Sequence, residues 1–376
     1  MLRNIVLVAI IFISFSYSCF ADRLQNIVIF GDSLSDAGYA NNFHNIDNDW
    51  PTIPSNSKKI KQATYSSPDA HYTVWPQYLG INNKNIATPN NLLTFPQNIN
   101  RAVKPFLKGN DYAAGGATTI CKGIGEKGDY IPPPIGPLRD GENCMDDSKN
   151  IEKYNQIDSY LKQHNNKANP NTIYIIWGGA NNAFLQLQAF TNNRSMLVKL
   201  YFLIKYSITG SVSPTKELKG MDNAAKDIVY DVNYLIRHGA KPKNIYVINL
   251  PDLGIIPIAT DNGKTTKSFK TALFDSLSTA FNDQLRRSSS KGINIINSNK
   301  FFKAIVKNKE VRVNGVEYTF SNVTQSACDF KGSNALTCIP KDYNSGKYNK
   351  YLFAGKVHPT SYTHQVLAKY IASKIS

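Results

Sequence analysis

Short apolar runs alternate with segments of helical periodicity along this chain. Four runs rich in β-branched residues occupy residues 26–30, 172–177, 244–250 and 292–297, and turn-forming residues bound them. Such runs are typical of parallel strands that are buried on both faces of a sheet. Apolar residues recur at helical spacing over residues 151–161, 224–238, 272–287 and 361–375. The pattern predicts an α/β fold with a mainly parallel sheet covered by helices.

Three stretches interrupt this alternation. Residues 40–110 are rich in Asn, Pro and aromatic residues, and residues 121–144 and 308–350 contain cysteines. None of them has a periodic apolar pattern of its own, so we expect loops that decorate one domain. Because residues 121–144 adjoin a glycine-rich turn, we hypothesise that this loop covers a binding site as a lid; a stapled surface loop is the alternative. The predicted organisation is a leader, residues 1–21, followed by a single domain, residues 22–376.

The leader has the pattern of a secretory signal peptide. Arg3 precedes an apolar run from residue 5 to residue 15, and small and polar residues lead to Ala21. Cys19 offers a lipoprotein anchor as an alternative, but the residues before it fit that signal poorly. No later run is long enough to cross a bilayer. We therefore expect a soluble mature chain that is secreted or periplasmic.

Four cysteines follow the leader, namely Cys121, Cys144, Cys328 and Cys338. An even number of cysteines in an exported chain indicates disulfides. Pairing between sequence neighbours, Cys121 with Cys144 and Cys328 with Cys338, is the first guess among three connectivities. The spacing does not resemble that of zinc ligands, so we expect no metal and no other cofactor.

The formal net charge of the chain is +16. This excess makes anionic surfaces such as phospholipid membranes candidate partners. The lysines are scattered among asparagines, and no stripe of basic and aromatic residues predicts a groove for nucleic acid. A surface that keeps the protein soluble is the simpler interpretation of the charge.

A serine stands at the end of the first apolar run, in "NIVIFGDSLSDAGY" from residue 26 to residue 39. Reacting groups of open α/β sheets gather beyond the carboxyl ends of the strands, so Ser33 is a candidate nucleophile. The segment after it looks like the start of a helix, and a helix N-cap is the alternative role. Asp32 is expected to hold the turn through backbone amides.

Three later blocks supply the groups that a nucleophilic serine needs. Residues 110–119, "NDYAAGGATT", place two glycines in a turn that can present an amide, and residues 177–184, "WGGANNAF", contain Asn181. Residues 355–364, "GKVHPTSYTH", hold His358 before a predicted helix, where it is a candidate base. Taken alone, each block is also compatible with an ordinary turn or helix cap that has no catalytic role. The other histidines, including His364, have no companion motif and are expected to be surface or packing residues.

The segments "GDSLSDAGY", "DYAAGGA", "GANN" and "GKVHPT" resemble, in this order, the four sequence blocks of the GDSL, or SGNH, hydrolases. The exported form with cysteine-closed loops is most similar to the phospholipase A and glycerophospholipid:cholesterol acyltransferase branch of Gram-negative bacteria. This resemblance implies a flavodoxin-like three-layer α/β/α sandwich. It also implies Ser33 as nucleophile and His358 as base. The oxyanion hole would combine the Ser33 amide, the Gly115 amide and the Asn181 side chain, with Gly116 as the alternative donor.

The resemblance further implies a serine esterase that needs no cofactor and hydrolyses acyl esters of phospholipids or lysophospholipids. Contact with a membrane surface would be transient, and a sterol or another lipid alcohol in place of water would give acyl transfer. One alternative is a short-chain carbohydrate or choline esterase of the same fold. Another is a catalytically impaired lipid-binding homologue.

Two positions depart from the family pattern. Gly355 stands where the family usually has an aspartate, three residues before the histidine, so the acid position of the triad is vacant. A backbone carbonyl, a water molecule, Asp342 or Asp252 could orient the imidazole instead. Asn182 replaces the aspartate that ends the third block, which we expect to matter less because Asn181 keeps the donating role.

Overall fold

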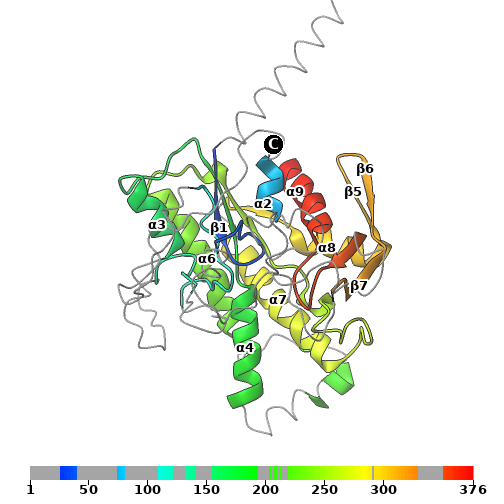
Figure 1. Ribbon diagram of the computed structural model, residues 1–376. Helices are drawn as coiled ribbons and strands as arrows, with labels where there is room; N and C mark the ends of the chain where they lie inside the picture. Colours follow the sequence, from blue (N-terminus) through cyan, green and yellow to red (C-terminus); the bar gives the residue numbers. More distant parts are fainter. Residues whose placement is uncertain are drawn as a thin grey trace, which may run out of the picture.

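The computed structural model describes residues 26–39, 74–80, 109–121, 132–139, 155–193, 203–204, 206–209, 212, 219–289, 292–328 and 350–375. Its centre is a parallel sheet with the strand order β1-β2-β3-β4 (Figure 1). These strands are β1 (Ile27–Gly31), β2 (Ile173–Trp177), β3 (Ile245–Ile248) and β4 (Asn294–Ile296). All four lie within or one residue from a predicted run, so the prediction of a parallel sheet is confirmed.

Helices cover both faces of this sheet. Figure 1 shows α6 (Lys219–Arg237) and α7 (Phe269–Ser288) on one face, with α2 (Trp75–Gly80) and α9 (Ser361–Ile375) on the other. The remaining helices are α3 (Gln156–Gln163), α4 (Ala180–Asn193) and α8 (Ser298–Asn308). The first three strands are buried along their whole length, which is why they read as continuous apolar runs rather than as alternating ones.

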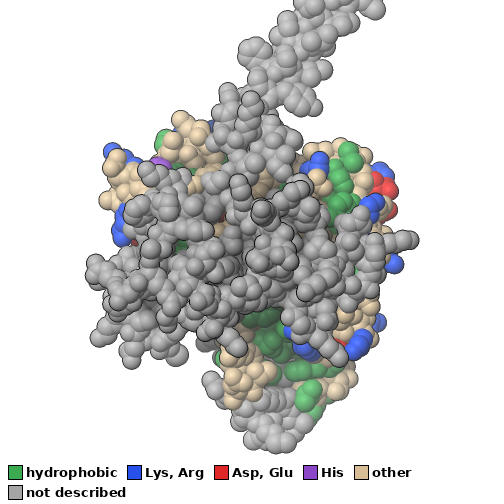
Figure 2. All heavy atoms as spheres, in the orientation of Figure 1, with side chains coloured by type: hydrophobic (Ala, Val, Ile, Leu, Met, Phe, Trp, Pro, Cys, Tyr) green, Lys and Arg blue, Asp and Glu red, His purple; other side chains and the backbone are tan. Residues whose placement is uncertain are grey.

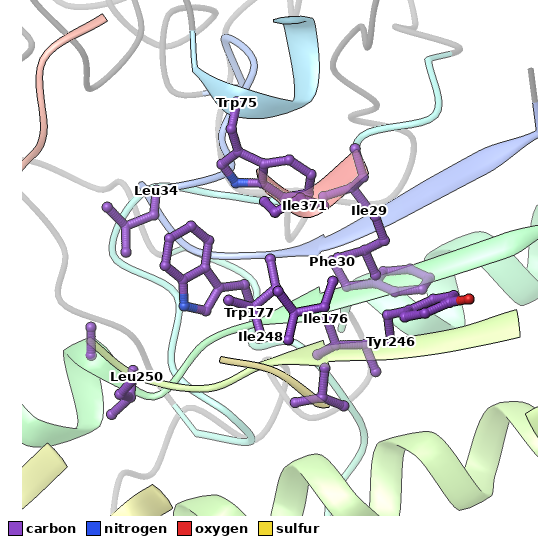
Figure 3. Close-up of a cluster of buried hydrophobic side chains, with 14 of the residues drawn as sticks. Ile29, Phe30, Leu34, Trp75, Ile176, Trp177, Tyr246, Ile248, Leu250 and Ile371 are labelled. Atoms are coloured by element: carbon purple, nitrogen blue, oxygen red, sulfur yellow. The ribbon is translucent and has the colours of Figure 1, made fainter. Parts of the chain in front are cut away.

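Aromatic side chains fill the space between the sheet and its helices. Figure 3 shows Trp75 of α2 and Ile371 of α9 beside the strands, with Trp177 at the end of β2. The ring centroids of the two tryptophans are 6.3 Å apart. Trp177 and Tyr112 are both buried in the core. This packing fixes the carboxyl end of the sheet, where the candidate site lies.

The prediction that residues 308–350 form only a loop is wrong over residues 310–326. β5 (Glu310–Val313) and β6 (Val316–Thr319) form an antiparallel hairpin, and β7 (Asn322–Ser326) pairs in parallel with β8 (Tyr351–Phe353). Asn314 and Gly315 connect the hairpin with φ angles of 48° and 79°. An Asn-Gly pair with two positive φ angles is typical of a tight hairpin. The prediction relied on apolar runs and therefore missed this hairpin.

The helix expected after Ser33 is also absent from the described residues. Residues 32–39 form consecutive turns instead, in which the Asp32 carbonyl accepts from the amides of Ser35 and Asp36. The Asp36 carboxylate then accepts from the amides of Gly38 and Tyr39. A short side chain that binds nearby amides competes with a helical ladder, which explains why the helix does not propagate. Ser33 is therefore not a helix N-cap.

Some of the sequence predictions concern residues outside the described ranges. Cys121 and Cys328 are both disulfide-bonded. Cys144 and Cys338 lie outside the described residues, so the pairing stays a prediction, as does the leader at residues 1–21. No helix within the described ranges is both long enough and apolar enough to cross a bilayer.

Candidate active site

The turn that carries Ser33 begins where β1 ends. Gly31 lies so close to β2 that a Cβ atom at this position would be 2.5 Å from the Trp177 carbonyl oxygen. The Gln156 side chain accepts from the Gly31 amide and donates to the Gly31 carbonyl, both at 2.8 Å. Asp32 Oδ1 accepts from the Leu34 amide at 3.0 Å, which confirms the structural role predicted for Asp32. The backbone on both sides of Ser33 is thus held in place.

A second segment runs beside β1 and carries the glycine-rich turn to the same edge. The Ile29 amide donates to the Asn110 carbonyl at 3.0 Å, and the Tyr112 amide donates to the Ile29 carbonyl at 2.8 Å. A turn follows in which the Ala117 amide donates to the Ala114 carbonyl. Gly116 is the third residue of this turn, which spans residues 114–117, and its φ of 82° favours glycine. The two turns therefore leave the sheet side by side.

Asp36 joins the two turns, and this contact corrects one predicted role. Its Oδ2 accepts from the Gly115 amide at 2.8 Å. The Gly115 amide is therefore occupied by a carboxylate, which argues against its assignment as an oxyanion donor. Gly116, the alternative donor, lines the cavity beside Ser33. Within the described part of the chain, the amides of Ser33 and Gly116 make no hydrogen bond.

Asn181 reaches the same place from the first turn of α4. Its side-chain amide donates one hydrogen to the Ala117 carbonyl at 2.8 Å, and Asn181 lines the cavity. One amide hydrogen remains for a ligand, and the amino end of a helix favours negative charge. The neighbouring Asn182 accepts from the Thr119 amide at 3.2 Å and donates to the Thr119 hydroxyl at 3.1 Å. Asn182 therefore ties α4 to the end of the glycine-rich turn.

His358 meets Ser33 from the opposite end of the sequence. It lies in the turn between β8 and α9, where the Ala354 amide donates to the His358 carbonyl at 2.8 Å and Phe353 forms a bridge with Pro359. Its Nε2 atom lies 2.7 Å from Ser33 Oγ, although the two residues are 325 positions apart. The structure therefore brings together the hydroxyl and the imidazole that the sequence singled out.

Burial sets the charge state of this imidazole. It lowers the pKa of His358 to about 4, so the ring is neutral near pH 7 and its Nε2 atom can accept the Ser33 proton. His364 of α9 is buried, and its Nδ1 atom accepts from the Trp75 amide at 3.3 Å. Burial and the nearby His358 lower the pKa of His364 to about 3. Of the two roles predicted for His364, packing is the one observed.

The position of the triad acid is filled by a buried glycine, Gly355. Asp252 lines the cavity, but its Oδ1 accepts from the Gly254 amide at 2.8 Å and its Oδ2 lies 3.3 Å from Lys303 Nζ. Its carboxylate is thus engaged by a turn and a surface lysine. Asp342 lies outside the described residues. The vacancy predicted from the sequence is therefore present in the histidine turn itself.

An apolar cavity of about 290 Å³ opens beside the serine and the histidine. Ser33, Asn181, Asp252 and His358 are its polar side chains. Its apolar wall includes Phe184 of α4, Leu253 of the short helix η6 (Leu253–Ile255) and, further along the chain, Ile256, Ile258, Phe302 and Val357. Such a wall accommodates hydrocarbon rather than a polar group.

The described part of the loop that we considered as a lid, residues 132–139, does not line this cavity. Ile135 is buried in the core, and Arg139 Nε lies 2.5 Å from the Asp227 carboxylate on α6. The loop is thus tied to the helical layer in this region, and nothing in its described part supports a lid.

Comparison with known proteins shows the family to which this chain belongs. Residues 27–371 match the family model described as GDSL-like Lipase/Acylhydrolase. The chain is also 23% identical over 391 residues to a protein named Lipase 1 from Photorhabdus luminescens, an alignment that covers 95% of this chain and 51% of the relative. The chain thus spans about half the length of that relative. Because the family match covers nearly the whole described fold and includes all four sequence blocks, the chain belongs to the GDSL-like lipase/acylhydrolase family, whose members hydrolyse carboxylic esters.

Proposed function

We propose that the protein is a serine esterase that releases fatty acids from phospholipids or lysophospholipids. The observation that carries this proposal is the 2.7 Å contact between Ser33 Oγ and His358 Nε2, two residues that line an apolar cavity. A hydroxyl in contact with a neutral imidazole is the arrangement that activates a serine nucleophile. The hydrocarbon wall of the cavity favours an acyl chain over a sugar or choline group.

In the proposed reaction, Ser33 Oγ attacks the ester carbonyl while His358 Nε2 takes the hydroxyl proton. The negative charge that develops on the carbonyl oxygen is stabilised by the amides of Ser33 and Gly116 and by the Asn181 side chain. His358 then gives its proton to the leaving alcohol, and an acyl-enzyme remains. Water, deprotonated by His358, attacks this ester and releases the fatty acid together with free Ser33. A lipid alcohol in place of water gives acyl transfer by the same steps.

The glycine at position 355 weakens this machinery without removing it. A triad carboxylate stabilises the imidazolium that forms during attack and orients the ring. Without one in its own turn, His358 is a weak base, in agreement with its low pKa. Oxyanion donors and substrate binding still accelerate the reaction when one triad member is lost. We therefore propose a working Ser33–His358 pair of reduced activity rather than an inactive lipid-binding protein.

Export is part of the proposal. The signal-like pattern of residues 1–21 supports a secreted or periplasmic location. The disulfide-bonded state of Cys121 and Cys328 is consistent with it, because structural disulfides persist in oxidising compartments.

The test is hydrolysis of lysophosphatidylcholine together with labelling by a fluorophosphonate probe. We expect the parent protein to release fatty acid and to form a covalent adduct at Ser33. Ser33→Ala should lower the rate by on the order of 10⁴-fold and abolish labelling. Ser373→Ala, at a serine near the end of α9, is the matched control and should behave like the parent. Labelling that persists in Ser33→Ala would refute the assignment of the nucleophile.

A further inference from the structure

An exposed apolar segment follows α4. It consists of residues 203–204 and 206–209, all of which are helical. The exposed fractions of Leu203, Ile204 and Ile208 are 44%, 51% and 78%. Among the described residues, the other exposed large hydrophobic side chains are Leu185 and Val316. The exposed aliphatic surface of the described chain is thus concentrated on α4 and this apolar segment.

The apolar segment packs against the rest of the fold through Tyr206. The rings of Tyr206 and Phe269, the first residue of α7, meet edge to face with centroids 5.9 Å apart. Tyr206 and Phe269 also pack against a buried cluster formed by Phe190, Val212 and Leu273. Figure 1 shows this segment at the lower end of the molecule, below α7, and Figure 2 shows hydrophobic side chains at that end. The helical segment is therefore held in place by Tyr206, while its aliphatic residues remain exposed.

One helix links this surface to the candidate active site. Asn181 and Phe184, near the amino end of α4, line the cavity. Phe190, near its carboxyl end, belongs to the cluster that anchors the apolar segment. The helix α4 thus carries residues of the cavity near its amino end and a residue of the anchoring cluster near its carboxyl end.

The charge of this region identifies the chemistry of the partner. No Asp or Glu occurs in the sequence between Asp158 and Glu217. In the sequence around the apolar segment, the basic residues are Arg194, Lys199, Lys205 and Lys216. A sequence that combines aliphatic and basic residues without acidic ones favours an anionic lipid surface, because hydrocarbon enters such an interface and basic residues are attracted to anionic headgroups.

We propose that the apolar segment docks the protein on anionic phospholipid surfaces and that Leu203, Ile204 and Ile208 enter the interface. This inference rests on the proposed lipid-esterase function and specifies how the enzyme meets its substrate.

The test compares binding to vesicles with hydrolysis of a soluble ester. The variants are Ile208→Asp and the double variant Leu203→Asp/Ile208→Asp. Val316→Asp is the matched control, because Val316 is 52% exposed but lies on the β5–β6 hairpin. Flotation measures binding to vesicles of phosphatidylcholine alone and of phosphatidylcholine mixed with phosphatidylglycerol. Hydrolysis of p-nitrophenyl butyrate reports the chemistry without an interface.

We expect the parent to bind the vesicles that contain phosphatidylglycerol more tightly than those without it. Ile208→Asp should weaken this binding by about tenfold or more, because a large aliphatic side chain no longer enters the interface. The double variant should bind these vesicles still more weakly, whereas the rate of butyrate hydrolysis should stay unchanged in every variant. Val316→Asp should bind vesicles like the parent.

Several results would overturn the docking proposal. One is unchanged vesicle binding by the double variant, and another is an equal loss in Val316→Asp. Conversion of a dimer to a monomer in the double variant, with vesicle binding intact, would assign the segment to self-association instead. Failure of the proposed esterase function is distinguishable, because flotation does not require turnover and butyrate hydrolysis does not require docking.

Discussion

The two turns that deliver the reacting pair are held in different ways. In the nucleophile turn, residues 32–39, side chains make the decisive contacts, as the Asp36 carboxylate accepts from three backbone amides. Ser35 also accepts from Trp75 Nε1 at 3.2 Å. In the histidine turn, residues 354–359, backbone contacts dominate, and the Lys356 carbonyl accepts from the Ile258 amide at 2.9 Å.

This difference separates positioning from activation. The serine is positioned by individual side chains, so single substitutions should move it and the oxyanion donors beside it. The histidine is positioned by its backbone, so it should stay in place when nearby side chains change. What the histidine turn lacks is a carboxylate, and substitution there should improve activation rather than disturb position.

Among substitutions that leave Ser33 and His358 in place, the largest effect should come from Asp36→Asn. One of the amides that Asp36 now accepts from would face an NH₂ group, and the turns of Ser33 and Gly116 would lose their shared anchor. We expect kcat for a soluble ester to fall by roughly 10²–10³-fold with little change in KM, because the oxyanion donors are displaced. Unfolding in urea should show a loss of about 2–3 kcal/mol.

Asp283→Asn is the control for this prediction, because Asp283 pairs with Arg286 on the exposed side of α7. It should leave both the rate and the free energy of unfolding nearly unchanged. An Asp36→Asn variant with the parent rate would show that Asp36 does not position the oxyanion donors.

The next effect should come from Gly116→Ala. An alanine at a φ of 82° is strained by about 1–2 kcal/mol, and relief of this strain would rotate the amide that we assign to the oxyanion. We expect a loss of roughly 10²-fold in kcat. Gly315→Ala, with a φ of 79° and open space around the added carbon, is the matched control. It should cost similar stability in thermal unfolding but no activity, and equal activity losses in the two variants would refute the role of Gly116.

A smaller effect, opposite in direction, is expected from Gly355→Asp. In the parent, the neutral imidazole is the active form, so the acid limb of the kcat/KM profile should lie near the His358 pKa of about 4. A carboxylate beside the ring would stabilise the imidazolium and raise this pKa, which shifts the limb to higher pH. The rate at neutral pH should rise by about tenfold. A profile that does not move would mean that the new carboxylate does not reach the imidazole.

The smallest effect should come from Asp32→Asn and should concern stability. Burial, with a further contribution from Asp36, raises the pKa of Asp32 to about 7. The folded state therefore holds a proton that the unfolded state releases near pH 4, so stability falls as pH rises from about 4 to about 7. Asparagine resembles the neutral acid and should remove this loss. We expect similar unfolding free energies at pH 4 and a gain of about 1–3 kcal/mol over the parent at pH 8. A parallel pH dependence in both proteins would contradict the raised pKa.

The sequence predicted the sheet because its strands are buried on both faces and consist of apolar, β-branched residues with turns at their ends. It missed the β5–β6 hairpin, whose residues are largely exposed and lack an apolar run. It also missed α4 as a helix, because "GGANNAF" fits a turn as well as a helix start. Exposed and short elements leave weak hydrophobic patterns, and the Asn-Gly pair was the signal that could have revealed the hairpin.

By itself, the sequence determined which residues could react, since Ser33, Asn181 and His358 stand in recognisable blocks just after strands or just before helices. Only the tertiary structure decided which glycine amide is already engaged, because the Asp36 carboxylate accepts from the Gly115 amide, while Gly116 lines the cavity. It also decided the charge of the imidazole, since burial depends on what packs around the ring. Residue types are local properties of the chain, whereas amide directions and desolvation arise when distant segments meet.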